Sequence, residues 1–556
     1  KKLTNADGGS LYLANKDRTH LDFMIVLNDT LGFVQGGTSG NPITMRSVPL
    51  YDSEGNENHH NVVSHTFHTE TTERIPDAYE VGFYDFSGTR AFDAENNYRS
   101  TSFMTVPLKP RGGGDVLGAL QLINALDEET GEPIPFPESL QGFVEALSSA
   151  AAVAVQNWKL MERQKRMFDD LVRFVGSAID AKSPYTARHC ARVPEIAGML
   201  VDQAQAEKSG PLGDFDLTQE ERREFEIGAW LHDCGKITTP EFVVDKATKL
   251  ETIYNRIHEI RTRFEVLLRE AWIRRLEAIQ AGGAAATADA ECAQTERTRK
   301  ADFACVTASN VGPEYREAEK LERLERISRT TWTRHFDDQI GLSWGEIRRL
   351  EELGLRTDKP KLPAVETLLA DRPEHIVPRE NWTQESYKKM GFQIAVPDHL
   401  YNRGEKYNLS VRTGTLTPEE RFKIDEHVAQ TIVMLEHLPF PDELSLVSEY
   451  AGSHHEFLDG TGYPRGLRAS ELSIPARIIA IADIFEALTS SDRPYKRDKT
   501  LSEAVAILKE MKDNGKIDPE LFRLFLVSGV YKKYAQEYMQ PWQIDDVDVG
   551  SVALSE

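Results

Sequence analysis

The chain has 556 residues, which is too long for a single hydrophobic core and predicts two or three domains. Hydrophobic residues make up 40% and charged residues 28%. No apolar run approaches the ~20 residues of a membrane-spanning helix, so we expect a soluble cytoplasmic protein without membrane insertion. The formal net charge of −23 disfavours broad electrostatic binding to nucleic acid. An anionic substrate would therefore need a local positive site.

The first residues and the cysteines bear on the origin of the chain. Residues 1–7 read as the interior of an element, so we expect the natural chain to begin earlier. The four cysteines show no paired zinc-type spacing, and we interpret them as reduced thiols that pack in the interior. They are Cys190, Cys234, Cys292 and Cys305.

Residues 1–157 combine β-type runs with a helical end. Strands are predicted at residues 9–14, 20–26, 102–108 and 116–124, and a helix at 143–157. This is typical of an α+β sensor domain. Residues 102–108 followed by 118–124 resemble the signature of GAF domains, which implies a pocket for an unknown small ligand. Ala125 stands where cyclic-nucleotide-binding members carry a lysine, which argues against a cyclic nucleotide there. We expect loop positions rather than a haem or metal site for His59, His60, His65 and His68.

A predicted helix with one apolar stripe, called the seam here, crosses the end of this domain. From Ala146 to Ala178, mostly apolar residues recur at alternating spacings of four and three, with Asn157 and Gln164 as polar interruptions. This spacing indicates a coiled coil. A helix packed on its own domain is the alternative, but the pattern runs unbroken across the expected domain boundary. We therefore predict that residues 158–182 connect two domains and that the chain forms a parallel homodimer.

Histidines and aspartates with metal-ligand character follow in separate patches. His189 leads an amphipathic helix, and His232-Asp233 ends another, with Lys236 one turn later. A carboxylate at a helix end can bridge two cations. His427 lies inside an N-capped helix, and His454-His455 precedes the turn Gly462-Tyr463-Pro464. Asp483 stands alone in an apolar helix, where an ionised carboxylate is costly without a cation or a donor. Nitrogen and oxygen ligands without thiolates suit iron or manganese, and zinc less well.

Taken together and in this order, these motifs resemble the HD-GYP family of cyclic di-GMP phosphodiesterases. The resemblance covers residues 168–251 and 414–530 and implies an all-α domain with a centre of two or three metal ions, commonly iron or manganese. Two departures stand out: Cys234 replaces an aliphatic residue, and Tyr185 occupies a position where three-metal members carry a glutamate. Two metal ions are therefore favoured over three. The metal ligands that the resemblance implies are His189, His232, Asp233, His427, His454, His455 and Asp483.

The resemblance also implies roles in catalysis and binding. Asp233 would bridge the metal ions, and Lys236 would stabilise charge that develops on the scissile phosphate. Arg493 and Lys496 are candidates for phosphate contact, with surface salt bridges as the alternative. Tyr463 either contacts the substrate or belongs to a rigid turn that holds the two histidines. The expected reaction is hydrolysis of cyclic di-GMP to linear pGpG, and further to GMP as an open possibility.

The HD-GYP domain is expected at residues 183–535, and residues 252–413 interrupt it. Residues 253–271 keep a 4-3 apolar spacing and Gly282-Gly283 breaks it, which predicts a helical hairpin followed by an irregular lobe. This insertion contains none of the motif residues, so we interpret it as a regulatory or partner-binding arm. Residues 536–556 read as an acidic C-terminal tail.

Two other functions remain open. The domain could be a degenerate HD-GYP module that binds cyclic di-GMP or a protein without turnover. It could also be another HD-type nucleotide phosphohydrolase, but that function leaves His427, His454-His455 and the Gly462-Tyr463-Pro464 turn unexplained.

Overall fold

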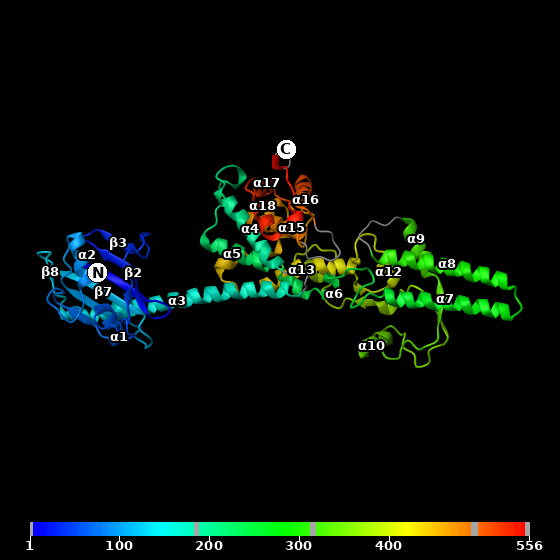
Figure 1. The fold of residues 1–556 in the computed structure, drawn as a ribbon, viewed down its shortest axis with the longest axis horizontal. Helices are drawn as coiled ribbons and strands as arrows, with labels where there is room; N and C mark the ends of the chain where they lie inside the picture. The colour runs from blue at the N-terminus through cyan, green and yellow to red at the C-terminus, as the bar shows by residue number, and fades with distance from the viewer. Residues whose placement is uncertain (1–3, 183–187, 312–317, 491–498, 551–556) are drawn as a thin grey trace. The chain divides into compact units, whose positions relative to one another are not determined.

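The computed structural model describes residues 4–182, 188–311, 318–490 and 499–550. The chain divides into two compact units, Lys1–Phe168 and Asp169–Glu556. The boundary between them falls inside one helix, α3 (Glu138–Asp180), and each unit is described here by itself (Figure 1). Within the described residues, no helix is both long and apolar enough to cross a membrane.

The first unit is built on an antiparallel sheet with the order β3-β2-β1-β7-β6-β5. β1 lies in the middle, where it pairs with β2 on one side and with β7 on the other. All four predicted strands are confirmed, as β1, β2, β6 and β7. The strands are β1 (Ala6–Ala14), β2 (His20–Asn28), β3 (Phe33–Gly36), β4 (Val48–Pro49), β5 (Glu73–Ile75), β6 (Phe103–Leu108), β7 (Gly118–Leu126) and β8 (Pro133–Ile134).

Two short helices complete this α+β unit, which confirms the predicted fold class. α1 (Val62–Thr69) contacts β6 and β7, and α2 (Ser87–Asn96) follows β5. Buried apolar residues of α1, such as Phe67, pack with Leu21 and Phe103 of the sheet. The prediction that all four histidines lie in loops was wrong in part, because His65 and His68 lie in α1.

α3 has 43 residues and spans the expected boundary at 157 without a break. Within the chain it buries a face that includes Val144, Ala152 and Val172. The predicted coiled-coil positions lie on another face, and they remain exposed from Ala150 onwards. Leu171 is 55% exposed and Phe174 is 68% exposed. The seam therefore has no partner within the described part of the chain, and the dimer stays a prediction.

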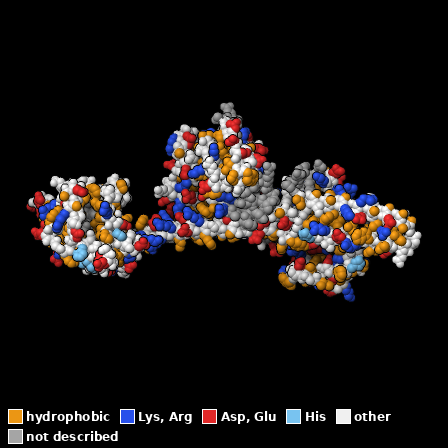
Figure 2. Space-filling view, viewed as in Figure 1, with side chains coloured by type: hydrophobic (Ala, Val, Ile, Leu, Met, Phe, Trp, Pro, Cys, Tyr) orange, Lys and Arg blue, Asp and Glu red, His pale blue; other side chains and the backbone are white. Residues whose placement is uncertain are grey.

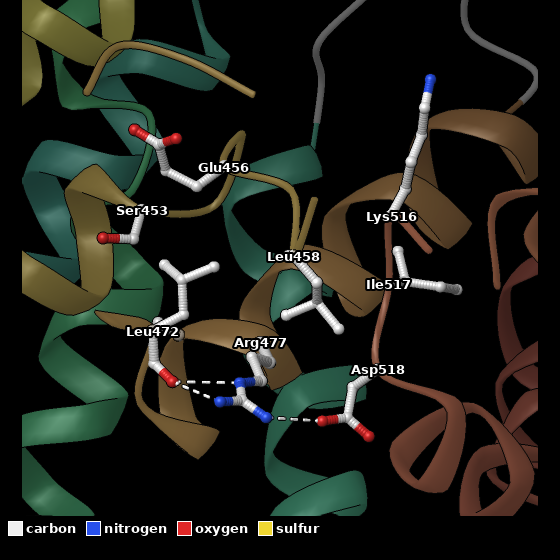
Figure 3. A pocket seen from close by; sticks show the side chains of 10 residues that line it. Ser453, Glu456, Leu458, Leu472, Arg477, Lys516, Ile517 and Asp518 are labelled. Atoms are coloured by element: carbon white, nitrogen blue, oxygen red, sulfur yellow. Dashed lines mark hydrogen bonds and ion pairs between the residues drawn. The ribbon is translucent and has the colours of Figure 1, made fainter. Parts of the chain in front are cut away.

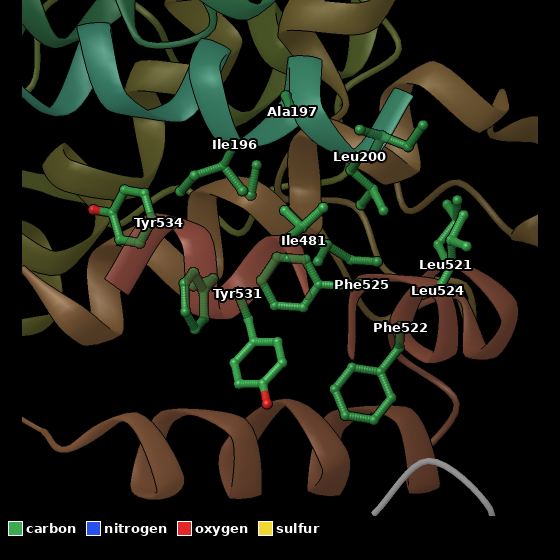
Figure 4. Packing of buried hydrophobic residues seen from close by; sticks show 14 of the residues in the cluster. Ile196, Ala197, Leu200, Ile481, Leu521, Phe522, Leu524, Phe525, Tyr531 and Tyr534 are labelled. Carbon is green, nitrogen blue, oxygen red and sulfur yellow. The ribbon is translucent and has the colours of Figure 1, made fainter. Parts of the chain in front are cut away.

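The core of the second unit is helical, as the fold class predicted. α15 is almost entirely apolar, so it can be buried on all sides. Figure 4 shows Ile481 of this helix among Ile196 and Leu200 of α4 and Phe525 and Tyr534 from the C-terminal helices. The helices of this core are α4 (His189–Ala206), α5 (Gln219–Leu231), α13 (Pro418–Glu436), α14 (Val447–Gly452), α15 (Ile474–Thr489), α16 (Leu501–Asp513), α17 (Pro519–Val527) and α18 (Val530–Tyr538).

The inserted segment begins with a helical hairpin after α6 (Glu241–Val244). α7 (Ile257–Gln280) and α8 (Ala285–Asn310) pack against each other, and Gly282 with φ +88° lies in the turn between them. α9 (Ala318–Ser328) packs on α8, with Leu324 and Ile327 buried. The lobe that follows contains β9 (Thr331–Arg334), α10 (Trp344–Glu352), β10 (Ala364–Thr367), β11 (Ile376–Pro378), α11 (Gln384–Lys389), β12 (His399–Asn402) and α12 (Glu405–Leu409).

The end of the lobe is joined to α13 by buried contacts. Tyr387 and Phe392 pack in one apolar cluster with Phe422 and Ala429 of α13. The fully buried Lys246 links the two, because it donates to Asn408 of α12 at 3.0 Å and to both carboxylate oxygens of Glu420 of α13 at 2.8 Å. The lobe therefore shares a core with the helical domain and is not a separate appendage.

The described part of the predicted acidic C-terminal tail contacts the helical core. Met539 and Gln543 are buried, and Gln543 Nε2 donates to the carbonyl of Thr489 at 3.0 Å. Apolar and amide groups thus anchor the segment in its described part, despite its acidic composition. Figure 2 shows acidic and basic side chains interspersed over the visible face of the molecule.

Candidate metal centre

The turn after α5 places the first pair of candidate ligands. α5 begins with a capping box formed by Thr218 and Glu221 and ends at Leu231, so His232 and Asp233 emerge at its C-terminus. The 3-10 helix η3 (Cys234–Thr238) follows and lies directly on α13. A Cβ atom on Gly235 would lie 2.0 Å from the carbonyl oxygen of His427, so only glycine fits this contact.

α13 holds His427 opposite this turn. The helix begins with a capping box formed by Thr417 and Glu420. Thr431, one turn after His427, accepts from the amide of Gly235 at 2.9 Å and donates to the carbonyl of His232 at 3.1 Å. This one hydroxyl group fixes the distance between the two ligand-bearing elements.

His454 and His455 follow α14, in a segment that is tied down at several points. Glu456 accepts from the backbone amides of Arg465 at 2.6 Å and Leu467 at 2.9 Å. The ring of Tyr463 stacks on that of His455, with centroids 5.0 Å apart. Tyr463 therefore orients a histidine from its side, as expected for a rigid turn.

A small cavity beneath this segment is shown in Figure 3. It measures about 10 Å³ and is lined by Ser453, Glu456 and Arg477 among others, so it has room for about one water molecule and not for a ligand. Arg477 of α15 closes it by donating to the Leu472 carbonyl at 3.0 Å and to Asp518 at 2.8 Å.

α4 and α15 supply the remaining candidates. His189 is the first residue of α4, and Asp483 lies in the buried middle of α15. His189 Nε2 lies 3.2 Å from Asp483 Oδ1, and its Nδ1 contacts the carboxylate of Glu486. Glu486 is three residues after Asp483, so both carboxylates lie on one face of α15 and hold His189 between them.

Asp233 lies at the middle of the cluster. Its Oδ2 is 3.1 Å from His189 Nε2 and 3.3 Å from His232 Nε2. Its Oδ1 is 3.1 Å from His427 Nε2 and 3.9 Å from His454 Nε2. One carboxylate therefore faces two histidine pairs with its two oxygens, which is the arrangement of a bridging ligand.

Hydrogen bonding fixes which nitrogen of each histidine faces Asp233. In His232, His427 and His454, Nδ1 lies 2.5–2.8 Å from the backbone carbonyl three residues earlier. A carbonyl only accepts, so each Nδ1 carries a proton, and Nε2 is the nitrogen of each ring that faces the centre and is available to coordinate.

This arrangement tests whether the residues fit a metal ion. Asp233 Oδ1, His427 Nε2 and His454 Nε2 are buried and have no hydrogen-bond partner in the part of the chain that is described. Two acceptors facing each other without a proton between them repel, and a cation between them removes the repulsion. The buried acceptor atoms of this centre therefore fit a metal ion.

The ligand atoms form two groups, each within 4.8 Å: His427 with His454 and His455, and His189 with His232 and Asp233. These two groups, which both face the carboxylate of Asp233, are consistent with a metal site, and they leave the identity and number of the ions open.

The pKa values of Asp233 and His455 are shifted in the directions that favour metal coordination. Burial by itself would raise the pKa of Asp233, but the charge of Lys236 and the contacts with His232 and His189 outweigh it and lower the pKa well below its usual range. Burial lowers the pKa of His455 to about 3, so this ring stays neutral and able to coordinate. Lys236 Nζ lies 2.5 Å from Asp233 Oδ2, which places a cation directly beside the centre.

All seven predicted ligands are thus brought together, whereas part of the predicted substrate site cannot be compared with the structure. Arg493, Lys496 and Tyr185 lie outside the described residues. Sequence reasoning missed Glu486, Thr431 and Glu456. The spacing of three residues between Asp483 and Glu486 on an apolar helix was a usable signal for the first of them.

A helical domain whose buried centre consists of histidines and carboxylates is typical of one class of metal-binding domains. Comparison with known proteins indicates the family within this class. An HD-domain family model matches residues 363–521, which include His427, His454 and Asp483. The chain contains an HD domain, and that domain is homologous to the HD-GYP cyclic di-GMP and cGAMP phosphodiesterases.

Three relatives illustrate the homology. The 3'3'-cGAMP-specific phosphodiesterase 1 of Vibrio cholerae is 33% identical over 166 residues, which is 28% of this chain and 36% of that protein. A cyclic di-GMP phosphodiesterase of Pseudomonas aeruginosa is 36% identical, over 25% of this chain and 30% of that protein. One from Thermotoga maritima is 36% identical, over 26% of this chain and 40% of that protein. The chain thus spans 30–40% of the length of these three relatives.

Two solved structures are similar to part of this chain. One is a GAF domain from Geobacter sulfurreducens, with 15% identity over 28% of this chain and 84% of that one, and a TM-score of 0.20. The other is the GAF domain of an Acinetobacter phosphoenolpyruvate-protein phosphotransferase, with 16% identity over 28% and 76%, and a TM-score of 0.18. The α+β assignment of the first unit rests on its own antiparallel sheet.

Proposed function

We propose that this chain hydrolyses the phosphodiester bond of cyclic di-GMP at the centre around Asp233. The observation that carries the proposal is the convergence of three buried, partnerless acceptor atoms, Asp233 Oδ1, His427 Nε2 and His454 Nε2, on one point. The homology to cyclic dinucleotide phosphodiesterases supports the substrate class.

The residues have distinct roles in this proposal. His189, His232, Asp233, His427, His454, His455 and Asp483 would hold two metal ions, iron or manganese, with a third less favoured. When bound, such ions lower the pKa of a coordinated water and neutralise charge on phosphate oxygens. Lys236 would donate to an oxygen of the scissile phosphate from its place beside Asp233. Tyr463 would keep His455 in its orientation by stacking, and Arg493 and Lys496 would contact phosphate.

A second candidate substrate is 3'3'-cGAMP. It is favoured by the relative from Vibrio cholerae whose name gives that specificity. The described ligand set is the same for both substrates, so the choice depends on contacts to the two bases. We propose the linear dinucleotide as the first product in either case.

The wider architecture is also part of the proposal. The sensor domain would occupy residues 1–157 and bind an unknown small ligand, and residues 158–182 would connect it to the phosphodiesterase domain at 183–535. A homodimer through α3 would carry the signal between them.

Anaerobic loading with iron or manganese and a turnover assay test the proposal. We expect linear dinucleotide from cyclic di-GMP, with 3'3'-cGAMP as a parallel arm. Asp233→Ala should lose metal and activity together, because no other carboxylate bridges the two histidine pairs among the described residues. Full metal occupancy with binding of cyclic di-GMP but no turnover would instead support a binding module. Turnover of nucleoside triphosphates alone would support a general phosphohydrolase.

A further inference from the structure

Two adjoining cavities lie in the inserted lobe, one of them extending to α13, and neither is lined by a candidate metal ligand. The arginine cavity has a volume of about 880 Å³ and is lined by Arg256, Arg349 and Arg403 among others. The tryptophan cavity has a volume of about 620 Å³ and is lined by Trp344, Trp382 and Arg379 among others. Arg349 lines both, so the two cavities meet at the start of α10.

Three cations of the arginine cavity, Arg256, Arg349 and Arg403, form no ion pair within the described part of the chain, whereas Arg334 and Arg372 of the same lining do. Arg256 and Arg349 donate only to backbone carbonyls, those of Leu250, Arg403 and Glu374, and Arg403 lies over the ring of Tyr401. A protein with a net charge of −23 has many carboxylates, yet these three guanidinium groups form no ion pair within the described residues.

The acidic residues that line the same cavity are already engaged. Asp338 pairs with Arg334 at 3.1 Å and with Arg372 at 3.0 Å. Glu374 lies 3.6 Å from Arg372, and Glu346 accepts from Ser343 in the cap of α10. The cavity therefore keeps a local excess of positive charge.

Two buried guanidinium atoms point to a missing ligand. Arg256 Nη2, in the arginine cavity, is buried and has no hydrogen-bond partner among the described residues, and the same holds for Arg379 Nη2 in the tryptophan cavity. A buried donor without an acceptor is costly. Burial lowers the pKa of Arg403 and the nearby charge of Arg349 lowers it further, although arginine stays protonated. An anion among these groups would relieve both costs.

The chemistry of the two cavities differs in a complementary way. Guanidinium forks match phosphate oxygens with paired hydrogen bonds. Indole rings are stacking surfaces for nucleobases, and Trp344 is 75% exposed while Trp382 is 37% exposed. A ligand with phosphate groups in the arginine cavity and a nucleobase in the tryptophan cavity would be a nucleotide. We propose that the lobe binds a nucleotide with at least two phosphate charges, with its phosphates on Arg256, Arg349 and Arg403.

The position of the tryptophan cavity makes this nucleotide an effector. Lys423 and Glu426 of α13 line it, and they pair at 2.6 Å. Glu426 also accepts from the hydroxyl of Tyr387 and directly precedes His427. A base in this cavity contacts the helix that carries a candidate metal ligand, so binding there changes turnover. The binding itself is independent of the proposed function, and only this effect on turnover rests on it.

Calorimetric titration of the metal-free full chain tests the site, with GTP, cyclic di-GMP and linear pGpG as separate probes. We expect at least one to bind, and Arg349→Ala and Arg403→Ala each to weaken its binding about tenfold or more, as for a lost charge-assisted hydrogen bond. Arg349→Lys keeps the positive charge but lacks the paired N–H donors of the guanidinium group, so its affinity should lie between those of the wild type and Arg349→Ala. The control is Arg269→Ala on α7, whose guanidinium pairs with Glu265 at 2.6 Å and should not affect binding.

The three probes distinguish the source of the ligand. Binding of GTP alone indicates a nucleoside triphosphate, binding of cyclic di-GMP indicates the proposed substrate, and binding of pGpG indicates its product. The inference is overturned when none of the three binds, or when the Arg349 and Arg403 variants bind like the Arg269 control while their thermal unfolding matches the wild type. Because the titration reads binding without turnover, failed hydrolysis with intact binding contradicts the proposed function only.

Discussion

At the scale of single residues, the centre depends on charges placed beside Asp233. Lys236 lies one helical turn after Asp233 and reaches its Oδ2 at 2.5 Å. This lysine cannot coordinate a metal ion while protonated. Burial by itself would lower its pKa, but the charges of Asp233 and Asp483 outweigh burial and raise the pKa. In the proposed reaction, it would act as a fixed cation beside an anionic substrate.

Removing this cation should slow the reaction without emptying the site. We expect Lys236→Ala to keep its metal content and to lower kcat by ~10²–10³, the range for loss of one electrostatic stabiliser of a transition state. Elemental analysis and steady-state kinetics on the same preparation measure both, with the exposed Lys208→Ala as control. Joint loss of metal and activity would show instead that Lys236 keeps Asp233 in place.

Glu486 is a positioning residue for the first ligand on α4. Its carboxylate contacts His189 Nδ1 and so orients Nε2 toward Asp233. Partners of this kind typically change metal affinity by ~10–100-fold when they are removed. We expect Glu486→Leu to weaken metal binding in this range and Glu486→Gln, which keeps an acceptor oxygen, to weaken it less.

Metal titration with a competing chelator measures the effect of the Glu486 variants. The exposed Glu510→Gln on α16 is a matched control and should bind metal like the wild type. An unchanged metal affinity in Glu486→Leu would mean that the backbone of α4 alone orients His189.

At the scale of elements, α3 poses the main open question. It buries one face within the chain and leaves the predicted seam exposed, with Met167 at 69% and Phe174 at 68%. A run of exposed apolar residues along one helix face marks an interaction surface. Because the seam follows the coiled-coil spacing, a second copy of α3 is the partner that we predict.

Charges in the seam should therefore separate the two copies. We expect the double variant Leu171→Asp and Phe174→Asp to be monomeric in light scattering, where the wild type is dimeric. The control is Lys165→Glu, an exposed change outside the seam positions, which should leave the mass unchanged. A wild type that is itself monomeric at high concentration would contradict the predicted dimer through α3.

At the scale of the whole molecule, the inserted segment has two parts that contact the helical domain to different extents. The hairpin of α7 and α8 packs mainly on itself and on α9. The end of the lobe shares a core with α13, and the amide of Gln393 donates to the carbonyl of Pro464 at 2.7 Å. The lobe thus touches the turn that orients His455, whereas the end of the hairpin does not.

Two deletions should separate these parts. Replacing residues 273–291, the end of the hairpin, with a short Gly/Ser linker should leave metal content and thermal unfolding unchanged. Replacing residues 255–410 should lower the stability and the metal content, because Tyr387 and Phe392 no longer cover α13. Metal analysis and calorimetry on both variants measure this. Loss of metal in the shorter deletion would contradict the inference that the end of the hairpin does not support the metal centre.

The sequence by itself determined the residue types of the centre and their local positions. His232-Asp233 at a helix end and Asp483 in an apolar helix are local patterns, so helical periodicity and ligand chemistry suffice to single them out. The same holds for the strands of the first unit and for the hairpin, whose spacings and glycine break lie within short windows.

Only the tertiary structure decided how these elements meet. The contact of Gly235 with His427, the hydroxyl of Thr431 and the carboxylate of Glu486 join segments up to 297 residues apart. The lobe's shared core with α13 and the unpaired arginines of its cavity are likewise long-range features. The periodicity of apolar residues indicates which face of a helix is buried. It does not indicate which element covers that face, because packing between distant segments selects the covering element.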